Sequence, residues 1–244
     1  RDDVRDKMAY TRTNVFGAAN VATVCSVKNI RKIIFTSTVA VYGFAQPETG
    51  IKGKINPFNQ YGQSKFEAEQ KLQEWYERGS NSLIIVRPTV IFGEGNRGNV
   101  YNLFKQIASK KFLMIGRGQN TKSLAYVHNV VAFLEKAIAA DESFGIYNYP
   151  DTPDLTMNDL IKKSHKTLGI PHRDSFYIPV GLGLFIGFLA DKLAWITGKE
   201  LPLSAVRVKK FVTTTSFKTN KSDLCSFIAP YSLEEAIEKT LNYE

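Results

Sequence analysis

The stretch RKIIFTSTVAVYG, residues 31–43, joins a short apolar run to a cluster of small hydroxyl side chains. Residues 33–35 are consecutively apolar, which is typical of a strand covered on both faces of a parallel sheet. Residues 36–38 carry hydroxyl groups and follow the apolar run directly. Ligands of open parallel sheets bind beyond the carboxyl ends of the strands. The stretch therefore predicts a buried strand that ends in a ligand-binding crevice.

A second stretch, SLIIVRPTVIFG at residues 82–93, repeats this pattern of an apolar run followed by polar residues. IYNYP at 146–150 predicts a further strand. Apolar residues at helical spacing predict helices around and after these strands. The expected helices cover residues 4–28, 60–78, 99–110, 129–140, 156–168, 180–197, 203–210 and 232–241. This alternation predicts an α/β fold, a Rossmann-like doubly wound parallel sheet.

The order of the elements also predicts two parts of the chain. Residues 1–150 are expected to form most of the sheet domain, with segments of a second lobe within 94–125. Residues 151–244 are expected to form a smaller, mainly helical lobe that binds the substrate.

Composition excludes several classes of protein. The chain has 244 residues, of which 43% are hydrophobic and 23% charged, so a folded core is expected rather than disorder. Its 32 basic and 23 acidic residues give a net charge of +9, which suits an anionic ligand or surface. No dense basic run with interleaved aromatics occurs, so nucleic acid is not an expected partner. The two cysteines and three histidines form no metal-ligand pattern, which favours a reduced, cytoplasmic protein without a metal.

The most apolar segment, IPVGLGLFIGFLA at residues 178–190, is short for a bilayer span and is interrupted by glycines. No transmembrane segment is expected. A buried helix is the first interpretation of these residues, and peripheral contact with a membrane is the alternative.

Tyr61 and Lys65 open the expected helix 60–78 and lie four residues apart. Residues at this spacing share one face of a helix, so both side chains can approach the same small molecule. A phenol beside an ammonium group can exchange protons, because the positive charge favours the phenolate. Taken alone, the spacing also fits a chance pair on an amphipathic surface helix.

Five stretches in this order resemble the extended short-chain dehydrogenase/reductase family, and most closely its epimerase/dehydratase branch acting on nucleotide-activated sugars. They are NVFGAANV at 14–21, TSTVAVYG at 36–43, YGQSK at 61–65, RPTVIFGEG at 87–95 and KSLAYVHNVV at 122–131. Members of that family open with a strand, a G-x-x-G-x-x-G turn and a helix, which hold the cofactor pyrophosphate. This sequence contains no such turn, so we expect the chain to be part of a longer protein.

The resemblance implies a set of catalytic residues. Tyr61 would be the general base that removes a proton from a sugar hydroxyl, and its pKa would be lowered by Lys65. Lys65 would also hydrogen-bond the ribose of the nicotinamide half of NAD, with NADP left open. Thr38 would hydrogen-bond the reacting oxygen. A role in satisfying local backbone groups is the alternative for Thr38 and for its neighbour Ser37.

Further residues are assigned to the two ligands by the same resemblance. The cofactor-binding residues would be Asn14, Ser37, Lys65, Pro88 and Thr89. The substrate-binding residues would be Thr38, Val90, Arg97 and Lys122. Arg87 is interpreted as a structural ion-pair partner. Asn14 and Arg97 could instead be surface side chains.

The implied function is an NAD-dependent epimerase of a UDP-hexose or UDP-N-acetylhexosamine, working as a homodimer through helices 4–28 and 60–78. Dehydration is disfavoured, because Val39 and Ala40 follow Thr38 and neither can transfer a proton. Val90 and the apolar segment 178–190 favour an alternative, a dehydrogenase or reductase of a lipophilic alcohol. A non-catalytic dinucleotide-binding protein is the third interpretation.

Overall fold

The computed structural model describes residues 7–110, 112–171, 177–197 and 204–243. The chain divides into two compact units. The first comprises Arg1–Ile91, Ser123–Thr152 and Ser216–Ser232, and the second Phe92–Lys122, Pro153–Thr215 and Leu233–Glu244.

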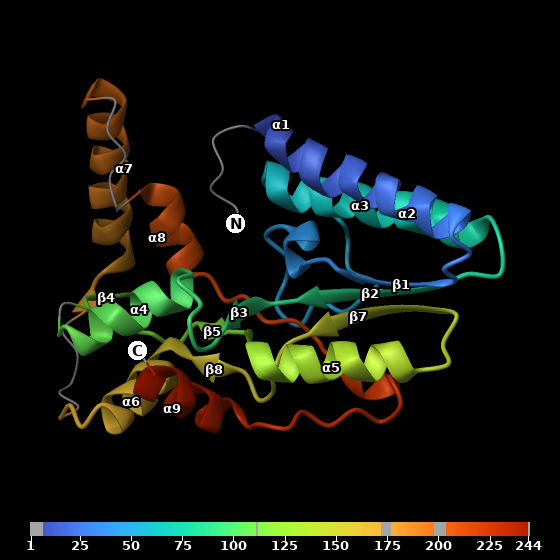
Figure 1. Cartoon of the computed structure of the whole chain (residues 1–244). Helices are drawn as coiled ribbons and strands as arrows, with labels where there is room; N and C mark the ends of the chain where they lie inside the picture. Colours follow the sequence, from blue (N-terminus) through green and yellow to red (C-terminus); the bar gives the residue numbers. More distant parts are fainter. Residues whose placement is uncertain (1–6, 111, 172–176, 198–203, 244) are drawn as a thin grey trace. The chain divides into compact units, whose positions relative to one another are not determined.

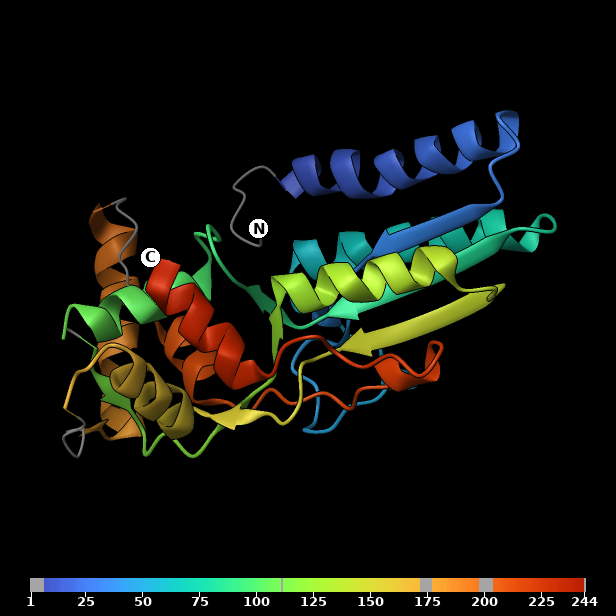
Figure 2. The same ribbon diagram turned by 60° about the horizontal axis from the view of Figure 1, so that its bottom comes forward.

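A three-stranded parallel sheet forms the centre of the first unit. Its strands are β1 (Lys32–Thr36), β2 (Ser82–Pro88) and β7 (Phe144–Tyr149), in the order β1-β2-β7. Figure 2 shows their three arrows running in the same direction. Central β2 is buried from Leu83 to Pro88, which explains its unbroken apolar run. The predicted parallel α/β sheet is confirmed.

Helices cover both faces of this sheet. In Figure 1, α2 (Gly17–Val27) and α3 (Gln60–Glu77) lie on one side and α5 (Val127–Ala139) on the other. Successive side chains of a strand point to opposite faces. Leu83 and Ile85 accordingly pack with α2 and α3, while Ile84 and Val86 pack with α5.

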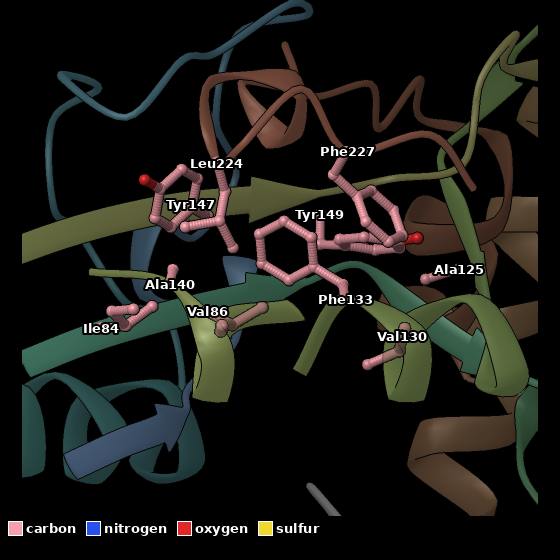
Figure 3. Close-up of a cluster of buried hydrophobic side chains, with 11 residues drawn as sticks. Ile84, Val86, Ala125, Val130, Phe133, Ala140, Tyr147, Tyr149, Leu224 and Phe227 are labelled. Atoms are coloured by element: carbon pink, nitrogen blue, oxygen red, sulfur yellow. The ribbon is translucent and has the colours of Figure 1, made fainter. Parts of the chain in front are cut away.

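An aromatic cluster forms the core under α5. The ring of Phe133 lies 5.0 Å from that of Tyr149 and 5.1 Å from that of Phe227, measured between centroids. Figure 3 shows Phe133 pointing toward these two rings. Phe227 follows the short helix η3 (Lys221–Asp223), so the segment Ser216–Ser232 completes the core of the first unit.

The predicted helix over residues 4–28 is not uniform. It comprises α1 (Lys7–Tyr10), a π-helical segment (Thr11–Phe16) and α2. A π-helical segment inside an α-helix is rare and is frequently found at functional sites.

Helices and short strands make up the second unit. The helices are α4 (Asn99–Ala108), α6 (Met157–Thr167), α7 (Val180–Thr197), α8 (Ala205–Val212) and α9 (Leu233–Tyr243). Strands β4 (Met114–Ile115) and β9 (Tyr177–Ile178) pair in parallel, and β5 (Thr121–Lys122) and β8 (Leu155–Thr156) pair antiparallel. A capping box of Thr156 and Asp159 begins α6. The predicted boundary between a sheet domain and a lobe at residue 150 stays a prediction.

Helix α7 is formed as predicted, but the first interpretation of residues 178–190 as a buried helix is wrong. Gly183 and Gly187 are the buried residues of α7, while most of its large apolar side chains are exposed. Among the described residues, α7 is the one helix that is long and apolar enough to cross a membrane by length and composition. A burial prediction from apolar composition alone fails when the helix packs through its smallest residues.

Candidate active site

The first turn of α3 places Tyr61 and Lys65 on one helix face. Asn59 is the N-cap, and its Oδ1 accepts a hydrogen bond of 2.9 Å from the backbone N–H of Gly62. This cap begins the helix at Gln60 and so places Tyr61 and Lys65 one above the other.

Gly62 lets this turn approach the segment that follows β1. A Cβ at Gly62 would lie 2.6 Å from the carbonyl oxygen of Ala40. Ala40 belongs to the 3-10 helix η2 (Val39–Tyr42), which begins at Thr38, and Thr38 Oγ1 accepts a 3.1 Å hydrogen bond from Ala40 N–H. The start of α3 therefore packs closely against the segment that follows β1.

Lys65 is held at the carboxyl end of β1. Its Nζ donates a 2.8 Å hydrogen bond to the carbonyl oxygen of Thr36 and lies 4.7 Å from the ring centroid of Phe35. Burial lowers the pKa of Lys65, and the charge of Glu69 partly opposes this shift. The remaining ammonium protons can be donated to another group, because Nζ carries three.

Ser37 presents a buried hydroxyl without a hydrogen-bond partner among the described residues. Its side chain is 3% exposed, while its backbone N–H donates to Val86 O at 2.6 Å. An unsatisfied buried hydroxyl costs about 1–3 kcal/mol. The Ser37 hydroxyl therefore makes no hydrogen bond to the neighbouring described backbone, whereas Thr38 Oγ1 accepts one from Ala40 N–H.

Asn14 is tied to α3 rather than exposed as a surface amide. Its Nδ2 donates a 2.9 Å hydrogen bond to Ser64 Oγ, and Ser64 Oγ donates to the carbonyl oxygen of Tyr61 at 2.9 Å. The ring of Tyr10 lies 5.9 Å from that of Tyr61. The π-helical segment thus faces the start of the Tyr61–Lys65 turn.

A buried ion pair fixes α3 against the end of β2. Arg87 Nε and Nη2 donate to the two carboxylate oxygens of Glu69 at 2.9 and 2.5 Å, and Nη1 donates to Tyr42 Oη at 2.7 Å. Burial by itself lowers the pKa of Arg87, but the bonds and charge of Glu69 outweigh it and raise the pKa. Tyr42 Oη in turn donates to Asn148 Oδ1 at 2.9 Å. The interpretation of Arg87 as a structural ion-pair partner is confirmed.

Sequence reasoning missed Glu69 and Tyr42. Glu69 stands four residues after Lys65, so helical spacing places it on the same face of α3. A carboxylate on a helix face that packs against a sheet requires a cation nearby. This position of Glu69 could have indicated a buried ion pair from the sequence.

The strand-end residues after β2 differ in exposure. Thr89 is buried, and its Oγ1 donates to Tyr149 O at 3.4 Å. Pro88 is buried, while Val90 on β3 (Val90–Phe92) is exposed.

Lys122 and Arg97 belong to the second unit. Lys122 Nζ donates to the carbonyl oxygens of Lys210 and Thr213 at 2.8 and 2.6 Å, and burial lowers the pKa of Lys122 to about 8. Arg97 is exposed and lies over the Tyr101 ring, 4.4 Å from its centroid. Lys122 therefore has a structural task at the carboxyl end of α8, and its predicted role with a phosphate stays a prediction.

Comparison with known proteins places this fold and site in a family. The model of the NAD dependent epimerase/dehydratase family matches residues 1–149. The chain belongs to this family. It is 47% identical, over its whole length, to N-acetyl-alpha-D-glucosaminyl-diphospho-ditrans,octacis-undecaprenol 4-epimerase of Escherichia coli O157:H7 and covers 74% of that protein. It is 27% identical to the UDP-glucose 4-epimerase of Vibrio cholerae, over 63% of this chain and 48% of that protein.

Solved structures share the fold at low identity. The UDP-glucuronic acid 4-epimerase from Bacillus cereus in complex with NAD matches with a TM-score of 0.75 at 17% identity, over 98% of this chain and 70% of that one. The UDP-N-acetylglucosamine 4-epimerase from Methanobrevibacter ruminantium M1 matches with a TM-score of 0.74 at 18% identity, over 98% and 71% of the two chains. The predicted family, fold class, enzyme class and NAD cofactor are confirmed, while the roles of single residues stay predictions.

The residues at the end of β1 fit the nicotinamide half of NAD. The unpartnered Ser37 hydroxyl and the Lys65 ammonium lie at the same strand end, where the fold binds its ligands. Ser37 Oγ has no hydrogen-bond partner in the part of the chain that the structure describes, and Lys65 Nζ keeps further protons beside the one donated to Thr36 O. Among the described residues, no cluster of His, Cys, Asp or Glu could hold a metal ion.

Proposed function

We propose that this chain forms the catalytic part of an NAD-dependent 4-epimerase that acts on a hexose or N-acetylhexosamine linked to a diphosphate. The observation that carries the proposal is the packing of the Tyr61–Lys65 turn against the Thr38 turn, with the unpartnered Ser37 hydroxyl beside it. The choice of C4 as the carbon that is inverted rests on the similarity to 4-epimerases.

Tyr61 is the general base of the proposed reaction. Its phenolate oxygen takes the proton of the sugar 4-hydroxyl. Thr38 Oγ1 hydrogen-bonds the oxygen of that sugar hydroxyl and so orients it. Lys65 stabilises the phenolate through its positive charge, from one helical turn away. NAD, when bound, supplies the acceptor of the hydride from C4 and its donor on return. After the sugar turns over, Tyr61 returns its proton to the oxygen at C4, so protons and electrons balance.

The group beyond the diphosphate has two candidates. A nucleoside is the first, since the UDP-sugar epimerases share this fold and the net charge of +9 suits a diphosphate. A polyprenol is the second, favoured by the high identity to the undecaprenol-linked 4-epimerase. The alternative of a lipophilic-alcohol dehydrogenase, favoured by Val90 and the apolar segment 178–190, matches relatives of lower identity, such as the 3beta-hydroxysteroid-dehydrogenase/decarboxylase isoform 1 of Arabidopsis thaliana at 26%.

The test uses the full-length protein that contains this chain, with Tyr61→Phe as the matched variant. UDP-N-acetylglucosamine, UDP-glucose and N-acetylglucosaminyl-diphospho-undecaprenol in detergent are incubated separately without added cofactor. Anomeric proton signals of the 4-epimer should form with one carrier class and disappear in the variant. Conversion that persists in Tyr61→Phe would refute Tyr61 as the base. If none of the three substrates is converted to its 4-epimer, and an apolar alcohol instead reduces added cofactor, the proposed epimerase function is refuted.

A further inference from the structure

Helix α7 exposes an apolar surface that is unusual for a helix in a folded chain. Trp195 is 86% exposed, Ile196 72% and Phe185 57%, and seven further large apolar residues of the helix are about one third to one half exposed. Isolated exposed apolar residues are ordinary, but a continuous apolar patch marks an interaction site.

Small residues explain how α7 can be packed and yet exposed. A Cβ at Gly187 would lie 2.7 Å from the backbone N of Ala205, and one at Gly183 would lie 2.7 Å from Ile115 Cγ2. Asp191 Oδ2 accepts a 3.0 Å hydrogen bond from Ala205 N–H. Residues 183, 187 and 191 follow one helical face at a spacing of four, and that face holds α8. Figure 1 shows α8 alongside α7.

Five of the large apolar side chains lie on the opposite side of α7 from α8. Leu182, Phe185, Leu189, Leu193 and Ile196 recur at spacings of three and four residues, and each is exposed. The carboxylate of Asp191 on α7 faces α8, where it accepts a hydrogen bond from the backbone N–H of Ala205. Lys192 lies with its Nζ 4.9 Å from the Phe188 ring centroid, and such a long side chain can keep its charge in water while its stem lies on apolar surface.

Positive charge accompanies this apolar face. Lys192 lies on α7 directly before Leu193 of the face, and the chain as a whole carries a net charge of +9. Trp195 stands near the carboxyl end of α7, and tryptophan is favoured at the headgroup level of a bilayer. An apolar face with a tryptophan and a flanking lysine, on a chain of net positive charge, matches the surface of a bilayer that contains anionic lipids.

We propose that α7, held by α8, docks on the surface of an anionic membrane with its apolar face in the boundary between headgroups and acyl chains. The helix lies on the membrane rather than across it, because α8 packs back along its small-residue face and its 18 residues are at the short limit for a span. This inference stands apart from the proposed function. If the epimerase proposal and the docking proposal both hold, α7 lies at the membrane surface, where the lipid part of a polyprenyl diphosphate would also be found.

Vesicle flotation of the full-length protein tests the proposal. Vesicles contain phosphatidylcholine alone or with one third phosphatidylglycerol, and the variant is Phe185→Glu with Leu189→Glu. Binding should require phosphatidylglycerol, weaken with salt and fall about tenfold or more in the variant, because two exposed apolar side chains that would enter the membrane boundary are replaced by charges. Ile138→Glu is the control, since Ile138 is an exposed apolar residue of α5, and it should bind as the parent does.

Each other outcome overturns the proposal. Absent binding, or equal binding by the α7 variant, refutes membrane docking. A parent that is oligomeric by light scattering and a variant that is monomeric would assign the apolar face to a second copy. Resistance of the bound protein to alkaline carbonate would show a helix that spans the bilayer. Thermal melting confirms that the variant folds, and 4-epimerase activity on a water-soluble UDP-sugar is measured separately, so loss of docking is distinguishable from loss of catalysis.

Discussion

Asn14 Nδ2 donates a 2.9 Å hydrogen bond to Ser64 Oγ, and Ser64 directly precedes Lys65 in α3. Ser64 is fully buried, and its hydroxyl passes the connection on to the Tyr61 carbonyl oxygen. The π-helical segment that carries Asn14 is thereby joined to the turn that carries the predicted base and its cation. We propose that Asn14 positions this turn through Ser64.

Replacement of Asn14 by alanine should therefore lower kcat about tenfold and leave KM within about twofold, because a small displacement of Tyr61 affects the transition state most. The free energy of unfolding should fall by about 1 kcal/mol for the lost hydrogen bond. Steady-state kinetics and urea denaturation measure the two effects. Asn20→Ala, at an exposed position of α2, is the control. Kinetics equal to those of Asn20→Ala would show that Asn14 does not position the turn.

The buried pair of Arg87 and Glu69 should be the costliest polar contact to break near the site. Either Arg87→Leu or Glu69→Leu leaves a buried charge without its partner, which typically costs about 3–5 kcal/mol. The double variant should lose less than the sum of the single changes, because no unpaired charge remains. A double-mutant cycle in urea measures this coupling.

Lys71 and Glu74 provide the matched control for that cycle. Their side chains form an ion pair on the surface of the same helix and are 44% and 47% exposed. Lys71→Ala should change the free energy of unfolding by less than about 0.5 kcal/mol. Equal losses for the exposed and the buried pair would contradict a structural role for Arg87 and Glu69.

Lys122 should make stability depend on pH in the alkaline range. Its folded pKa is lowered to about 8, below its ordinary 10.5, because burial disfavours the ammonium form. The unfolded chain therefore binds more protons between these values, and the contribution of Lys122 to the free energy of unfolding rises from pH 8 toward 10.5. Urea denaturation across this range should show a rise for the parent that Lys122→Met lacks. A parallel pH dependence of both proteins would place the folded pKa of Lys122 near its ordinary value.

Local patterns account for the parts that the sequence predicted well. Unbroken apolar runs predicted the strands, and helical spacing predicted that Tyr61 and Lys65 share one helix face. Both features depend on neighbours within a few residues along the chain. Glu69 beside Arg87, and the carbonyl oxygens of Lys210 and Thr213 beside Lys122, join residues distant along the chain, and no local pattern indicates which residue is the partner. The exposure of α7 was missed for the same reason. Its glycines decide which face packs on α8, and hydropathy does not reveal this choice.

Gly62 should be a position at which an added methyl group harms catalysis. In Gly62→Ala the new Cβ would lie 2.6 Å from Ala40 O and 3.1 Å from Pro57 Cβ, so the start of α3 must move away from the Thr38 turn. A shift of about 1 Å in a catalytic group can cost about 10²-fold in rate, so kcat should fall by one to two orders of magnitude. Gly17→Ala is the control: no atom lies within 4 Å of its added Cβ, and alanine in a helix should raise stability by up to about 1 kcal/mol without affecting kcat. Single-turnover rates and thermal melting separate the two variants, and an unchanged rate in Gly62→Ala would refute the proposed dependence of catalysis on the contact between α3 and the Thr38 turn.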